Sequence, residues 1–142
     1  MKFLCDKHKR WLVQHPEELL PGWQRTCRLG REAMSHAQWQ RAAVFFGNAW
    51  EMAELLLTQA PGKQAQQRYL DTAGDMMSAL REGAQSEHCR FVFSSVLNRL
   101  EQEGHLQCRQ ESLSLLREFA FGDAEYAHRI WQTQHIAGAY LH

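Results

Sequence analysis

Apolar residues recur at α-helical spacing between residues 23 and 60, and this pattern constrains the fold more than any other. Two apolar stripes are separated by a short polar link at residues 35–38, which contains neither Gly nor Pro. A link of this length is typical of antiparallel helices that pack against each other. The stripes comprise Trp23, Cys27, Gly30, Ala33 and Met34 before the link, and Trp39, Ala42, Ala43, Phe46, Ala49, Trp50 and Ala53 after it. This stretch therefore predicts a helical hairpin.

Proline and glycine divide the rest of the chain into further helical segments. A short helix or an extended lead-in is expected before Pro16, and Pro21 can lie in the first turn of the next helix, where its missing N–H is not needed. Later helices are expected at about residues 63–81, 86–104, 106–119 and 124–135. β-branched residues are scarce, so no strand pattern competes. We predict a single all-α domain that comprises residues 1–142.

The spacing of small and aromatic residues in the second helix of the hairpin recurs later in the chain. Ala42, Phe46 and Ala49 are matched at an offset of 47 residues by Cys89, Phe93 and Val96. Ala127 and Trp131 repeat the small-to-aromatic step after a further 38 residues. The pattern predicts about three hairpins, of which the second and third are irregular copies of the first.

Within residues 23–54 the hairpin resembles the tetratricopeptide repeat (TPR). The resemblance is carried by Leu29-Gly30 in the first helix and by Ala42, Phe46 and Ala49 in the second. Gly30 and the two alanines would let the helix backbones approach closely, with Phe46 filling the space between them. The chain departs from the family at Thr26 and Ala33, where aromatic residues are usual, and at Glu54, where a proline is usual. The resemblance implies a right-handed α-α superhelix of about three helical hairpins, preceded by an N-terminal lead-in.

A TPR-like stack implies a non-enzymatic module that binds another protein or peptide in a groove lined by the first helix of each hairpin. Such a module would act as a bacterial-type adaptor, co-chaperone or regulatory subunit; TPR-like domains of this size resemble the chaperones of bacterial secretion systems. The expected groove residues are Arg25, Arg28, Glu32, Tyr69, Thr72, Asp75 and Met76.

Charge and hydropathy narrow the classes of partner. The formal net charge is zero, which argues against nucleic acid as the partner of the whole molecule. Residues 1–31 nevertheless hold seven Lys and Arg side chains and three acids, a basic stretch that we interpret as a solvated helix face. No targeting segment or membrane-spanning run is present in the sequence, and the four cysteines lack a disulfide framework, so we expect reduced thiols and a cytoplasmic location.

The sequence contains no recognisable catalytic motif, so we expect no enzymatic activity. The spacing of Cys and His residues is compatible with one metal site. Cys5 and His8 are separated by two residues, as are His105 and Cys108, so a zinc ion bound by two Cys and two His side chains would join the lead-in to the third hairpin. No other cofactor is expected.

The sequence is compatible with two alternatives to the interaction module. The chain is compatible with a ligand-sensing or metal-sensing helical regulator whose pocket is lined by Met52, Met76, Met77 and aromatic side chains. Its basic N-terminal segment would couple it to a DNA-binding partner. Self-association into a homodimer is also possible through the last helix, which carries Ile130, Trp131, Ile136 and Tyr140.

Overall fold

The structure, a computed structural model, describes residues 3–102 and 110–122, and every element in these ranges is helical. The elements are α1 (Asp6–Gln14), the 3₁₀ helix η1 (Pro16–Glu18), α2 (Leu19–Ser35), α3 (Trp39–Gln59), α4 (Lys63–Glu82), α5 (Glu87–Gln102) and α6 (Gln110–Phe121). The predicted all-α fold class is therefore confirmed for the described residues. The helix expected at 124–135, with Ala127 and Trp131, lies outside them.

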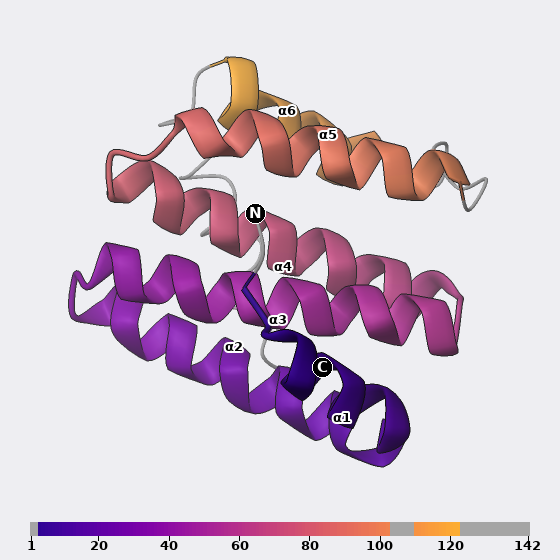
Figure 1. The fold of residues 1–142 in the computed structure, drawn as a ribbon. Helices are drawn as coiled ribbons and strands as arrows, with labels where there is room; N and C mark the ends of the chain where they lie inside the picture. Colours follow the sequence, from indigo (N-terminus) through magenta and orange to yellow (C-terminus); the bar gives the residue numbers. More distant parts are fainter. Residues whose placement is uncertain (1–2, 103–109, 123–142) are drawn as a thin grey trace.

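The long helices follow one another as antiparallel neighbours (Figure 1). Helix α3 packs against α2 and α4, and α4 in turn contacts α5 and α6, which also contact each other. Within the described ranges no helix is both long and apolar enough to cross a membrane.

The α2–α3 hairpin forms as the apolar stripes predict. Ala42, Phe46 and Ala49 of α3 are buried, and Gly30 of α2 lies directly against the Phe46 ring. A Cβ atom at Gly30 would lie 2.6 Å from Cε1 of Phe46, closer than van der Waals contact allows. The close helix approach expected at Gly30 is confirmed. Helix α2 begins earlier than predicted, at Leu19, because η1 leads straight into it; Pro21 still lies in its first turn.

The turns of the α2–α3 and α4–α5 hairpins have the same hydrogen-bond geometry. The N–H of Gln38 donates to the carbonyl of Ala33 and that of Ala37 to Met34, which is the Schellman pattern. The same two hydrogen bonds close α4, from Gln85 to Leu80 and from Ala84 to Arg81. Ala37 (φ 56°) and Ala84 (φ 59°) occupy the left-handed position that usually requires glycine, and they are 47 residues apart.

Helix α4 lies at the centre of the bundle. Thirteen of its twenty residues are buried, including the polar side chains of Gln66, Asp71, Thr72 and Ser78. A helix with one apolar stripe would bury about half of its circumference, so burial on this scale requires packing on opposite sides. Contacts with α3 on one side and with α5 and α6 on the other supply it.

Candidate interaction surface

The segment that precedes α1 is anchored to α3. The backbone N–H of Phe3 donates to Oε2 of Glu51 at 3.0 Å, and the N–H of Leu4 donates to the same oxygen. The Phe3 ring lies on Gly47, where any side chain would overlap it. Hydrogen bonds to a carboxylate are strong, so the two bonds to Glu51 hold residues 3 and 4 against α3. They thereby fix the point at which α1 begins.

Local interactions define both ends of α1. Cys5 is the N-cap, and its Sγ accepts a hydrogen bond from the N–H of His8 at 3.4 Å. At the other end the N–H of His15 donates to the carbonyls of Trp11 and Leu12, and Pro16 prevents the helix from continuing. The imidazole of His15 stacks on the Trp11 ring with centroids 4.4 Å apart. These contacts hold a short helix in place with little help from the core.

Helix α1 buries a single side chain. Leu12 is 2% exposed, whereas the other eight residues of the helix are exposed. Two of these are large and apolar, Trp11 at 43% and Val13 at 52% exposure. Leu29, Val44, Phe91 and Phe121 of other helices are exposed to a similar degree.

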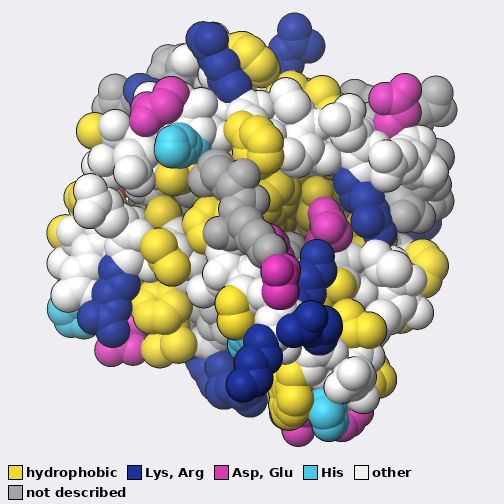
Figure 2. Space-filling model, in the orientation of Figure 1, with side chains coloured by type: hydrophobic (Ala, Val, Ile, Leu, Met, Phe, Trp, Pro, Cys, Tyr) yellow, Lys and Arg dark blue, Asp and Glu magenta, His cyan; other side chains and the backbone are white. Residues whose placement is uncertain are grey.

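The exposed charges of α1 are mainly positive. Lys7, Lys9 and Arg10 are all exposed, and Asp6 is the one acid in the helix. Lys and Arg side chains gather around α1 in the lower centre of Figure 2. We call the exposed part of α1 that carries Lys7, Lys9, Arg10, Trp11 and Val13 the α1 surface; Trp11 and Val13, two positions apart, lie on different sides of the helix. It combines apolar area with positive charge.

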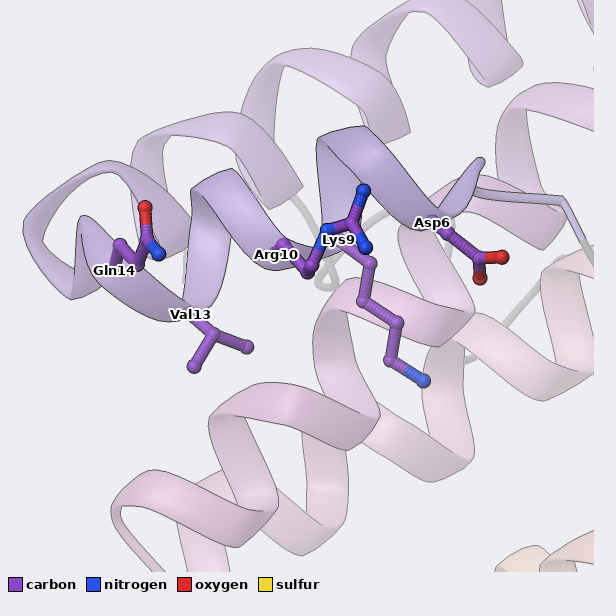
Figure 3. Close-up of a pocket in the computed structure, with 5 residues that line it drawn as sticks. All are labelled: Asp6, Lys9, Arg10, Val13 and Gln14. Carbon is purple, nitrogen blue, oxygen red and sulfur yellow. The ribbon is translucent and has the colours of Figure 1, made fainter.

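Part of the α1 surface is hollowed. A depression of about 380 Å³ is lined by Asp6, Lys9, Arg10, Val13 and Gln14. All five residues belong to α1 (Figure 3), and Lys9 and Arg10 each precede Val13 by about one helical turn. The isopropyl group of Val13 and the aliphatic parts of Lys9 and Arg10 provide apolar walls, while the charged ends of the two basic side chains provide hydrogen-bond donors.

The structure does not bring the seven predicted groove residues together on one exposed surface. Tyr69, Thr72 and Met76 of α4 are at most 1% exposed and lie inside the bundle. The hydroxyl of Thr72 accepts a hydrogen bond from Nε1 of Trp23 at 3.0 Å, and Tyr69 stacks on Trp50. Burial raises the pKa of Tyr69 well above its ordinary value. These three side chains offer a partner no accessible surface in this structure.

The other four predicted groove residues are accessible in different degrees. Arg25, Arg28 and Glu32 are exposed on the side of α2 that faces solvent, and Asp75 of α4 is half-buried. Trp23 and Cys27, which face α4, lie on the other side of α2. Partner binding by these four side chains stays a prediction.

The expected zinc site is divided between described and undescribed residues. Cys5 and His8 lie at the start of α1, whereas His105 and Cys108 lie outside the described residues. Among the residues that the structure describes, no group of three or more His, Cys, Asp or Glu side chains is arranged to hold a metal ion. The four-ligand zinc site stays a prediction.

The methionines proposed to line a ligand pocket pack in the core. Met76 and Met77 are fully buried and Met52 is 4% exposed. Ile130, Trp131, Ile136 and Tyr140, proposed for a dimer contact, lie outside the described ranges.

All three described cysteines are free thiols; Cys27 and Cys89 are buried, as expected of cysteines that serve as small apolar side chains, whereas Cys5 is exposed, which corrects that expectation. Burial raises the pKa of Cys27 to about 12, with a further contribution from the negative charge of Asp75. Burial likewise raises the pKa of Cys89 to about 11. Thiols with such pKa values stay protonated at neutral pH and are poor nucleophiles. Neither therefore has the properties of a catalytic cysteine.

Sequence reasoning missed the α1 surface because it favoured a solvated basic face for residues 1–31. A signal was available: Trp11 and Val13 flank Leu12, so the three cannot share one side of a helix, and a helix that packs on one side only leaves at least one of them exposed. The surface offers hydrogen-bond donors for carboxylates beside apolar area. Comparison of the chain with models of protein families, with curated proteins and with solved structures found no match.

Proposed function

We propose that this protein is a non-enzymatic interaction module that binds another protein or peptide, as an adaptor, co-chaperone or regulatory subunit. The observation that carries the proposal is the α1 surface: a helix held by one buried leucine exposes Trp11 and Val13 beside three basic side chains. Aromatic and basic residues are enriched where proteins bind one another, and Trp in particular contributes strongly to binding energy. The function belongs to this surface rather than to the predicted groove.

We also propose that the bundle is a TPR-like right-handed stack in which α2–α3 and α4–α5 are successive hairpins. Support comes from the small-aromatic-small pattern, which is buried in both hairpins at an offset of 47 residues, from Ala42 to Cys89. The two Schellman turns, at Ala37 and Ala84, have the same offset. Repetition of a packing pattern together with its turn is what a helical repeat requires.

The interaction function is tested by affinity capture from the source cell with the full-length protein and two matched double variants. Trp11→Ser/Val13→Ser removes the apolar area of the α1 surface. Leu29→Ser/Val44→Ser removes side chains of similar exposure, 45% and 51%, from α2 and α3. We expect one protein to be captured by the natural chain and by the second variant but lost from the first. Equal capture by all three forms would contradict the assignment of function to α1.

A further inference from the structure

The basic side chains of the α1 surface have their charge available for a partner. Within the described residues, Lys7, Lys9 and Arg10 form no ion pair. Arg25 and Arg28 on α2 are exposed cations as well. Positive charge therefore predominates on α1, where Asp6 is the one acid within the helix and Glu17 and Glu18 follow in η1. A ligand that complements it carries negative charge.

The hollow indicates that the ligand also has an apolar group. Val13, 52% exposed, lies one helical turn from both Lys9 and Arg10, and all three line the same depression. If an apolar side chain of a ligand contacted Val13, the ligand residues on one side of it would extend towards the charged ends of Lys9 and Arg10, which lie on the Asp6 side of Val13 (Figure 3). Carboxylates of neighbouring residues could then accept hydrogen bonds from the Lys9 ammonium and the Arg10 guanidinium. The hollow thus complements a short acidic segment with an apolar residue in it.

We infer that the α1 surface binds an acidic peptide segment in which Asp or Glu flanks an apolar side chain, an inference that rests on the proposed interaction function. Protein rather than nucleic acid is the favoured class for two reasons. The stacked His15 ring covers one face of Trp11, at 4.4 Å, which restricts base stacking on that indole. The apolar hollow between the basic groups has no counterpart in a phosphate backbone.

Fluorescence anisotropy of a short labelled peptide in which Glu and Asp flank leucine tests the inference on the full-length chain. A second peptide replaces the acids with Gln and Asn, and a third probe is a labelled single-stranded DNA. The protein variants are Lys9→Gln/Arg10→Gln and a control, Arg41→Gln/Arg117→Gln, which removes two exposed cations from α3 and α6. Circular dichroism melting of each variant establishes that it is folded.

The natural chain and the control should bind the acidic peptide alike, while Lys9→Gln/Arg10→Gln should bind it roughly tenfold more weakly. The uncharged peptide should bind weakly, and added salt should reduce acidic-peptide binding. Equal losses in the two protein variants would mean non-specific attraction, and tighter binding of DNA with the same dependence on Lys9 and Arg10 would mean a nucleic-acid surface. Either result overturns the inference.

Failure of this inference is distinguishable from failure of the proposed function. If the acidic peptide does not bind but affinity capture still depends on Trp11 and Val13, the α1 surface is an interaction site for a partner of other chemistry, and the inference is wrong. If neither experiment depends on α1, both proposals are wrong.

Discussion

Helices α1 and α4 show two ways in which a helix can belong to the same bundle. Helix α4 buries thirteen of twenty residues, between α3 on one side and α5 and α6 on the other. Helix α1 buries one of nine and is held mainly by its ends: the Cys5 cap, the His15 hydrogen bonds and the anchored residues before it. Stability therefore depends strongly on α4, whereas most of the surface of α1 stays accessible to solvent.

Cysteine labelling should show the largest difference between α1 and the core. At pH 8, Cys5 at the start of α1 is exposed, whereas Cys27 has a pKa of about 12 and Cys89 of about 11, so both are protonated as well as buried. Since the thiolate is the reactive form, we expect Cys5 to be alkylated at least about a hundredfold faster. Peptide mapping by mass spectrometry measures the three rates. Comparable rates would mean that α2 and α5 open readily.

Truncation of a central α4 side chain should have the largest effect on stability. Met76 is fully buried, so Met76→Ala should lower the free energy of unfolding by about 2 to 5 kcal/mol, through lost burial and the cavity that remains. Urea unfolding followed by circular dichroism measures the loss. The matched change on α1, Val13→Ala, should cost less than about 0.5 kcal/mol. If the two variants were equally stable, the contrast between the helices would be wrong.

Adding a single carbon atom at Gly30, where α2 contacts α3, should lower the free energy of unfolding. Gly30→Ala would place Cβ 2.6 Å from the Phe46 ring, and overpacking of this kind costs about 1 to 3 kcal/mol. Replacing Phe46 with leucine provides room, so Gly30→Ala should cost less in that background. A double-mutant cycle by urea unfolding measures the coupling. Additive losses would show that the steric conflict is relieved elsewhere.

Much of the bundle follows from local sequence, because helical periodicity places the core residues of α2 and α3 without knowledge of their neighbours. The exposure of α4 does not follow in this way. The sequence predicts that Tyr69, Thr72 and Met76 line a groove. They are buried instead, because helices pack on both sides of α4 and cover residues that a single apolar stripe would leave exposed. Polar Gln66 and Ser78 give no sequence signal of that burial. The identity of the exposed surface therefore depends on tertiary packing.

The left-handed conformation of the two turn residues also cannot be predicted from the sequence. The link at residues 35–38 contains no glycine, and Ala37 adopts φ 56° because the Schellman hydrogen bonds and the packed helices impose it. Local preference alone would not place alanine there, nor at Ala84.

Glycine at the two left-handed positions should stabilise the bundle modestly. Ala37→Gly and Ala84→Gly each remove the steric conflict of Cβ, which should outweigh the greater freedom of glycine in the unfolded chain and contribute about 0.5 to 1 kcal/mol. Thermal melting measures the change. As a control, Ser94→Gly on the exposed side of α5 should lower stability by roughly 0.5 kcal/mol. A loss at Ala37 or Ala84 would mean that the turns are not constrained as described.

A small stability effect is expected for the variant that should matter most for binding. Trp11→Ser/Val13→Ser changes two side chains that are 43% and 52% exposed, so the free energy of unfolding should change by less than about 1 kcal/mol. Leu12→Ala in the same helix should cost about 2 kcal/mol or more, because Leu12 is the buried residue of α1. Urea unfolding of both variants decides between two roles for Trp11. If Trp11→Ser/Val13→Ser were as destabilised as Leu12→Ala, Trp11 and Val13 would hold α1 in place, and their apolar area would be structural rather than available to a partner.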